Sequence, residues 1–119
     1  MAMHEASLAG SVLRIVEKAA AREGFARVLR LRLAVGALAA VDEGALRFAL
    51  AAIAPGTVLD GARFDVETVP GRGRCTACGA EGPLPALGEP CAACGAWALR
   101  PTAGLDLRVI DLQVCDDEP

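Results

Sequence analysis

The chain has few aromatic residues and almost no histidine. Its 119 residues include three phenylalanines, one tryptophan, no tyrosine and a single histidine, and its formal net charge is −3. Nucleic-acid binding usually needs a cationic surface and stacking rings, so we expect no nucleic-acid partner. An enzyme is not indicated either, because His4 has no evident serine or cysteine nucleophile as a partner and no phosphate-binding loop is present.

Long apolar runs are also missing. No stretch approaches the roughly 20 apolar residues that span a bilayer. Residues 1–20 are interrupted by charges at Glu5, Arg14, Glu17 and Lys18, unlike a secretory signal. We therefore expect a cytoplasmic protein without membrane association. In that reducing compartment, cysteines indicate metal ligands before they indicate disulfides.

In the first half of the chain, apolar residues are spaced first as in a helix and then as in a strand. Residues 6–22 are predicted to form a helix, ended by Gly24, with a buried stripe of Leu8, Val12, Ile15, Val16 and Ala19. Residues 27–35 alternate with a period of two and predict a strand. Its buried side would carry Leu29, Leu31, Leu33 and Val35.

A second helix is predicted from an N-cap at Asp42 to the Pro55-Gly56 stop, with Leu46, Ala49, Leu50 and Ile53 buried. Residues 62–69 and 105–114 predict two further strands. In the last strand the apolar residues change phase, which indicates either a bulge or two partly covered faces.

The order of these elements predicts an α/β fold with a small three-stranded sheet, two helices on one face and a zinc-ribbon-like insert. We assign residues 1–69 and 104–119 to the α/β domain and residues 70–103 to the insert. The last two strands flank the insert, so we expect them to pair as a long hairpin.

Two CxxC-Gly sequences in the insert carry its chemistry. They supply Cys75, Cys78, Cys91 and Cys94, and four thiolates at this spacing favour one tetrahedral, structural Zn²⁺. A dithiol redox pair, an iron or iron–sulfur site and unliganded thiols are the alternatives. Cys115 lies outside the pattern and is interpreted as a spare thiol.

His4 lies just ahead of the first helix, where a solvated histidine would be ordinary. However, the start Met3-His4-Glu5-x-Ser7-Leu8, joined to the later CxxC pair, resembles the HypA/HybF family of hydrogenase nickel-incorporation proteins. The similarity extends through Val35-Gly36, Val41-Asp42 and residues 45–49, and so covers essentially the whole chain.

The resemblance implies a nickel metallochaperone that delivers Ni²⁺ for maturation of [NiFe] hydrogenase. It implies transient nickel at His4 and Glu5, assistance from Asp42, and structural zinc at the four cysteines. Residues 1–69 and 104–119 would then be a nickel-binding domain, and residues 70–103 a zinc-binding insert. The implied partners are the hydrogenase large subunit and a maturation GTPase, and we expect a monomer or weak dimer. Nitrogen ligands suit Ni²⁺ and tetrahedral sulfur suits zinc, so the two sites would separate two metals.

One departure from the family concerns the start. The family motif begins at its initiator methionine, whereas Met1-Ala2 precede it here. If Met1 is removed, the amine of Ala2, two amides and the His4 imidazole would form a self-contained square-planar nitrogen site.

Two further alternatives stay open. Asp42 could serve as a helix cap only, which is worth about 1 kcal/mol, or also as a ligand. The chain could instead be a zinc-ribbon interaction module without a nickel role. Arg27, Arg30 and Arg32 would support that module, although such arginines usually form a solvated face.

Overall fold

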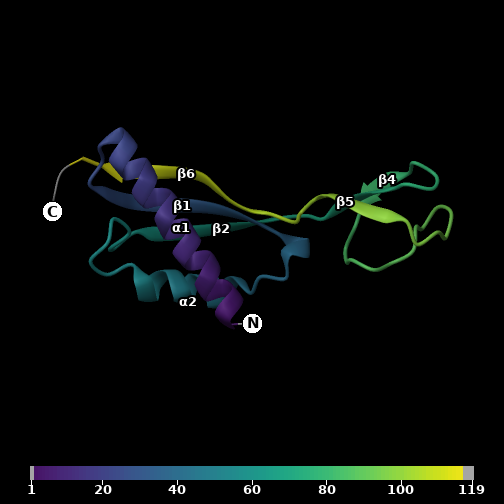
Figure 1. Cartoon of the computed structure of the whole chain (residues 1–119), viewed down its shortest axis with the longest axis horizontal. Coiled ribbons are helices and arrows are strands. Elements are labelled where there is room, and N and C mark those ends of the chain that lie inside the picture. Colours follow the sequence, from purple (N-terminus) through teal and green to yellow (C-terminus); the bar gives the residue numbers. More distant parts are fainter. Residues whose placement is uncertain (1, 117–119) are drawn as a thin grey trace. The chain divides into compact units, whose positions relative to one another are not determined.

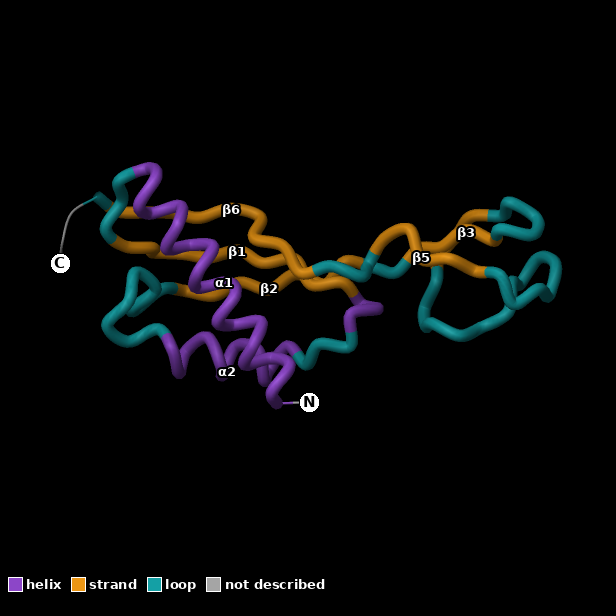
Figure 2. Tube along the Cα trace, viewed as in Figure 1, coloured by secondary structure: helices purple, strands orange, loops and turns teal. Residues whose placement is uncertain are grey.

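A computed structural model of the chain describes residues 2–116, with side chains from residue 4 onward (Figures 1 and 2). The elements are α1 (Ala2–Glu23), β1 (Arg27–Gly36), the 3-10 helix η1 (Ala37–Ala39), α2 (Glu43–Ile53), β2 (Arg63–Val69), β3 (Arg72–Cys75), β4 (Glu81–Pro83), β5 (Leu99–Ala103) and β6 (Leu107–Cys115). Two helices combined with three-stranded sheets confirm the predicted fold class.

Helix α1 begins earlier than predicted and buries a neighbouring stripe. Its buried residues are Glu5, Ala9, Val12 and Val16. The prediction for Ile15 was wrong, because its side chain is 53% exposed. Both stripes fit the helical period, so the sequence alone did not fix the rotation of the helix about its axis. Gly24 does end the helix, with φ of +81°.

Strand β1 is buried at Leu31, Leu33 and Val35, as predicted, but Leu29 is 47% exposed. The alternation breaks at the start of the strand, where Val28 is buried instead. The N–H of Val28 donates to the carbonyl of Val58, in the loop after α2, at 2.9 Å. The start of β1 thus contacts the loop after α2, a segment that the two-residue period of the strand does not reveal.

Helix α2 has the predicted cap and two of the four predicted core residues, Leu46 and Leu50, while Ala49 and Ile53 are only half-buried. The Asp42 carboxylate accepts a hydrogen bond from the N–H of Ala45 at 2.9 Å, and Leu46 and Leu50 are fully buried. Those two leucines and the buried face of α1 form the core together with Leu31 and Leu33 of β1. In Figure 1, α1 crosses the sheet, and α2 packs against α1.

The first sheet has the strand order β2-β1-β6. The predicted hairpin of the last two strands was therefore wrong, because β1 lies between them. Two ion pairs join β1 to its neighbours: Arg30 pairs with Asp65 of β2, and Arg32 with Asp111 of β6 at 2.6 Å. The central strand, β1, is also the most buried of the three, whereas no residue of the edge strands β2 and β6 is fully buried.

The insert contains a second sheet, with the order β4-β3-β5, that the sequence did not indicate. Both neighbours of β3 are antiparallel to it. These strands are only three to five residues long and rich in glycine, proline and arginine. No two-residue hydrophobic period can develop over such short segments.

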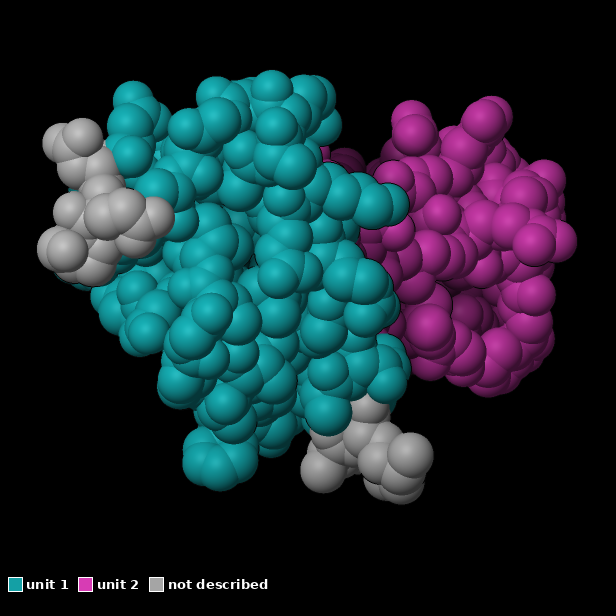
Figure 3. Space-filling view, turned by 60° about the vertical axis from the view of Figure 1, so that its left-hand side comes forward, with its two compact units in different colours: residues 1–33, 41–66, 109–119 teal, residues 34–40, 67–108 magenta. Residues whose placement is uncertain are grey.

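The chain divides into two compact units (Figure 3). The first unit comprises Met1–Leu33, Val41–Val66 and Val109–Pro119, and the second unit comprises Ala34–Ala40 and Glu67–Arg108. The second unit thus takes in residues on both sides of the 70–103 segment that we assigned to the insert. Within the described part of the chain, neither helix has the length and apolarity needed to cross a membrane.

Candidate metal sites

The two CxxC-Gly segments fold into the same turn twice. In the first, the N–H of Gly79 donates to the carbonyl of Cys75 at 2.8 Å. In the second, the N–H of Gly95 donates to the carbonyl of Cys91 at the same distance. Both glycines have positive φ, +79° and +77°, which a residue with a side chain adopts only with strain. The sequence therefore shapes each turn locally, as the pattern predicted.

Backbone hydrogen bonds then fix both turns to the segments that follow them. The N–H of Cys75 donates to the carbonyl of Ala80, and the N–H of Cys91 donates to the carbonyl of Ala96, at 2.9 and 2.8 Å. The N–H of Thr76 donates to the carbonyl of Ala98, just before β5, and so links the first turn to the segment that follows the second turn.

The four sulfurs lie at the corners of a compact cluster. The Sγ atoms of Cys75 and Cys94 are 3.7 Å apart, those of Cys78 and Cys91 are 3.8 Å apart, and all four lie within 4.8 Å of one another. A tetrahedron with metal–sulfur bonds of about 2.3 Å has sulfur–sulfur edges of about 3.8 Å. The observed spacing therefore fits one tetrahedral metal ion held by four thiolates.

The electrostatics of the cluster also fit a cation. The N–H groups of Cys94 and Ala93 donate to the Cys91 sulfur and lower the pKa of that thiol to about 7. The N–H of Ala96 lowers the pKa of Cys94, but burial and the three neighbouring thiols outweigh it and raise that pKa to about 11. Four thiols this close cannot all become anions unless a positive ion offsets their repulsion.

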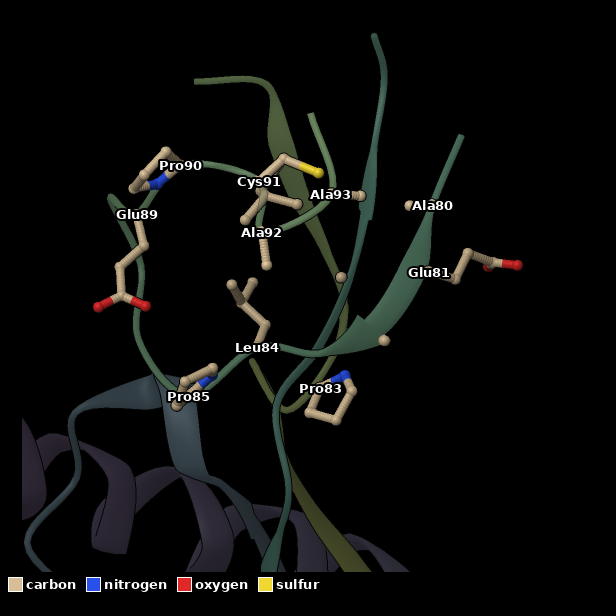
Figure 4. Close-up of a pocket in the computed structure, with 13 residues that line it drawn as sticks. Ala80, Glu81, Pro83, Leu84, Pro85, Glu89, Pro90, Cys91, Ala92 and Ala93 are labelled. Carbon is tan, nitrogen blue, oxygen red and sulfur yellow. The ribbon is translucent and has the colours of Figure 1, made fainter. Parts of the chain in front are cut away.

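Apolar residues line a cavity beside the cluster. A cavity of about 430 Å³ lies beside the second turn, and Figure 4 shows Leu84 pointing across it toward Cys91 and Ala92. Prolines at positions 83, 85 and 90 line the same cavity. Cys75 and Cys91 are buried, while Cys78 and Cys94 are exposed. Nothing in the sequence indicated that Leu84 is buried beside the site.

The second predicted site begins at His4, in the first turn of α1. The His4 side chain is half exposed, with Nδ1 at 3.7 Å from Oε2 of Glu5. In the first turn of a helix the backbone N–H groups have no intrahelical acceptor. His4 therefore offers both an accessible imidazole and a backbone nitrogen that the helix does not use.

Glu5 has a different environment, because its side chain is only 1% exposed. Its Oε2 accepts a hydrogen bond from the backbone N–H of Asp42 at 3.2 Å. That hydrogen bond holds the pKa of the Glu5 carboxyl below its ordinary value despite the opposing effect of burial. The structure thus brings the start of α1 next to the start of α2.

Asp42 is exposed, and its carboxylate caps α2. Its backbone, and not its side chain, makes the hydrogen bond to Glu5. Among the described residues, the four cysteines are the one group whose ligand atoms all lie within 4.8 Å of one another. His4, Glu5 and Asp42 are therefore neighbours without forming a preassembled cage. Met1 and the side chains of Ala2 and Met3, which belong to the trimmed-terminus hypothesis, lie outside the described residues.

Cys115 is half-buried at the end of β6 and is not part of the four-sulfur cluster. Its carbonyl accepts a hydrogen bond from the N–H of Ala26 at 3.1 Å. Nothing in these contacts gives the thiol a metal-binding role.

Comparisons with known proteins agree over nearly the whole chain. Residues 3–114 match the family model described as "Hydrogenase/urease nickel incorporation, metallochaperone, hypA". A curated relative from Polaromonas naphthalenivorans, named hydrogenase maturation factor HypA, is 56% identical over 115 residues, covering 97% of this chain and 100% of the relative. A relative of the same name from Cupriavidus necator is 52% identical, covering 96% of each chain.

A solved structure with a similar fold is the solution structure of the Ni metallochaperone HypA from Helicobacter pylori. It superimposes with a TM-score of 0.73 over 95% of this chain and 98% of that chain, at 20% sequence identity. At this identity the likeness supports the fold alone.

Proposed function

This chain belongs to the HypA family of hydrogenase and urease nickel-incorporation metallochaperones, and from that membership we propose that it binds Ni²⁺ near its start and delivers it for hydrogenase maturation. The observation that carries the proposal is the match of residues 3–114, which begins at the Met3-His4-Glu5 motif. The family is described as one of metallochaperones, which are proteins that carry a metal ion. The description names no catalysed reaction.

His4 is the proposed principal nickel ligand. It is the only histidine in the chain, its imidazole is half exposed, and the backbone N–H groups around it are not needed by the helix. Imidazole and backbone nitrogen suit Ni²⁺. A site with few ligands in a first helical turn can also open, which a protein that gives its metal away requires.

Glu5 and Asp42 are proposed as supporting residues of the same site. The Glu5 carboxylate lies 3.7 Å from the His4 imidazole and accepts a hydrogen bond from the backbone N–H of Asp42, which supports a role for both residues beside His4. Glu5 is buried and already accepts this bond, whereas the Asp42 carboxylate is exposed. Asp42 is therefore the better placed of the two to reach a metal ion at the surface.

We propose Zn²⁺ as the resident ion of the four-cysteine cluster. An all-thiolate tetrahedral set with edges of 3.7 and 3.8 Å matches zinc, leaves no open position for water, and so gives the ion a structural role. The residues that would hold it are Cys75, Cys78, Cys91 and Cys94. The nickel residues lie in the first unit and the cysteines in the second, so each unit would hold one metal.

The proposed partners are the hydrogenase large subunit and a maturation GTPase. We propose that this chain acts in the cytoplasm as a monomer or weak dimer. The family description also names urease, but no feature of this chain selects that client. The alternative, an interaction module without nickel, loses part of its support. Two of the arginines that favoured it, Arg30 and Arg32, are used in ion pairs within the first sheet.

The test is a Ni²⁺ titration of the zinc-loaded protein by calorimetry, with metal content measured before and after. We expect one nickel site that is lost in His4→Ala, while zinc stays at one ion per chain. Glu17→Ala, an exposed residue on the same helix, is the matched control and should titrate like the wild type. Undiminished Ni²⁺ uptake by His4→Ala would end the delivery proposal and leave the zinc-ribbon interaction module.

A further inference from the structure

The second sheet has two chemically different faces. Burial along β3 alternates strictly, with Gly73 and Cys75 buried and Arg72 and Arg74 exposed. The buried face carries the metal cluster and the apolar cavity of Figure 4. The exposed face therefore carries arginine side chains that the metal site does not use.

The strand register adds a third arginine to this face. Arg74 is directly opposite Arg100 of β5 and, on its other side, opposite Glu81 of β4. Residues directly opposite each other in antiparallel strands project from the same face, and like charges in that position destabilise the pair. We call Arg72, Arg74 and Arg100 the arginine face.

Glu81 places one carboxylate on the same face, opposite Arg74, but it makes no ion pair with Arg74 within the described part of the chain. None of the three guanidinium groups makes a hydrogen bond or ion pair within the described part of the chain. Five arginines of the first unit, at positions 22, 30, 32, 47 and 63, each pair with a carboxylate, although Arg14 and Arg27 do not among the described residues. With three arginines and one carboxylate, the arginine face is a cationic surface on a chain whose net charge is −3.

We propose that the arginine face docks an acidic segment of a partner protein, one rich in aspartate and glutamate. Guanidinium groups form two parallel hydrogen bonds to a carboxylate, and three of them on one flat face suit an extended acidic segment. A nucleic acid is disfavoured, because a chain with 3% aromatic residues has few rings for stacking. The proposal does not depend on the nickel site and can stand if that site is wrong.

A purely structural role for the arginines would be to offset the charge of the metal-bound thiolates. Exposed charges are screened by water and salt, so such an offset from the outer face would be small. The two roles differ in what they predict: loss of arginines should weaken zinc binding if they balance the metal, and partner binding if they dock an acidic segment.

The experiment measures binding of fluorescein-labelled poly-glutamate to the zinc-loaded protein by fluorescence anisotropy at low ionic strength. We expect Arg74→Gln/Arg100→Gln to weaken binding by roughly tenfold or more, since charge-assisted hydrogen bonds are the strong ones. The control Arg14→Gln/Lys18→Gln removes the same charge from the exposed side of α1 and should bind like the wild type. Added salt should weaken the wild-type interaction.

Zinc content and thermal stability are measured on the same samples. The docking role predicts one zinc ion per chain in both double variants, and stability that is unchanged or raised when the Arg74–Arg100 repulsion is removed. Equal poly-glutamate binding by the two double variants would overturn the proposal, and so would tighter binding of a single-stranded oligonucleotide than of poly-glutamate. If Arg74→Gln/Arg100→Gln loses zinc, the single variant Arg72→Gln replaces it in the binding experiment. Poly-glutamate binding by Arg72→Gln as tight as that of the wild type would then overturn the proposal.

Discussion

At the scale of single residues, Glu5 joins the two helices of the first unit. Carboxylates are almost never fully buried unless they are paired. Here the burial is explained by the stripe of α1 to which Glu5 belongs and by the Asp42 N–H that its oxygen accepts. Glu5 therefore has a structural role that its place in the nickel motif did not indicate, alongside the ligand role that stays a proposal.

The lowered pKa of Glu5 gives stability a pH dependence of known sign. The unfolded chain takes up this proton near pH 4.5, whereas the folded protein takes it up only at lower pH. Ionised Glu5 therefore stabilises the fold above pH 4.5, and that contribution is lost as the pH falls through the lowered pKa. We expect the wild type to exceed Glu5→Gln in stability at neutral pH, and the difference to shrink on acidification.

Urea unfolding of both proteins over this pH range measures the difference directly. The ionisation of Asp65, whose pKa is lowered by Arg30, affects both proteins alike and cancels. A difference that stays constant down to strongly acid pH would show that the charge of Glu5 is not what stabilises the fold.

Two substitutions of Asp42 distinguish a helix-capping role of its carboxylate from a nickel-binding role. Asn caps a helix as well as Asp, so Asp42→Asn should unfold like the wild type, while Asp42→Ala should lose about 1 kcal/mol. If the carboxylate also binds nickel, both variants should show weaker Ni²⁺ affinity in the same titrations. Wild-type affinity in Asp42→Asn would limit Asp42 to the cap seen in the structure.

At the scale of elements, glycines allow the segments that lead into and out of the second sheet to lie against each other. Gly71 precedes β3, and Gly104 follows β5 with φ of +89°. A Cβ on Gly104 would lie 2.7 Å from the Cα of Gly71 and 3.0 Å from the carbonyl oxygen of Pro70. No side chain fits between these backbones, so close approach requires glycine there.

Gly104→Ala should therefore destabilise the second unit. The left-handed backbone costs a residue with a side chain about 1–2 kcal/mol, and the clash with the backbone of Gly71 adds to it. Gly82→Ala is the control, because a Cβ at Gly82 meets nothing within 4 Å. Thermal unfolding of the zinc-loaded proteins makes the comparison, and equal melting temperatures would contradict the close approach.

At the scale of the whole molecule, the two units differ in what stabilises them. Both helices and most of the large buried side chains belong to the first unit, including Leu31, Leu46, Leu50 and Leu59. Among the described residues, the apolar side chains that the second unit buries, beyond its cysteines, are those of Ala34, Val35, Leu38 and Leu84. So small a core needs a second source of stability, and a bound metal ion supplies it in such modules.

Removal of the metal should consequently unfold one unit and spare the other. We expect Cys75→Ser, or treatment of the wild type with a chelator, to abolish amide-exchange protection in β3, β4 and β5 while α1 and α2 stay protected. Cys115→Ser is the matched control, since this cysteine lies outside the cluster, and it should keep its metal and its protection. Retained zinc in Cys75→Ser would contradict the four-cysteine assignment.

The sequence by itself determined the features that depend on neighbouring residues. The CxxC-Gly turns, the Asp42 cap and the stop at Gly24 each follow from a side chain or a glycine acting within a few residues along the chain. The family resemblance likewise rested on short motifs, and the family match confirmed it. The structure contains these features as predicted because no contact with a distant segment competes with them.

The tertiary structure decided everything that depends on distant partners. It chose the Val16 side of α1 over Ile15, it buried Val28 instead of Leu29, and it placed β1 between the strands expected to pair. It also built the second sheet and, through the strand register, set Arg74 beside Arg100. The physical reason is that the hydrophobic periodicity of a helix or strand is compatible with more than one buried face. Only packing against segments far along the chain selects which face is buried.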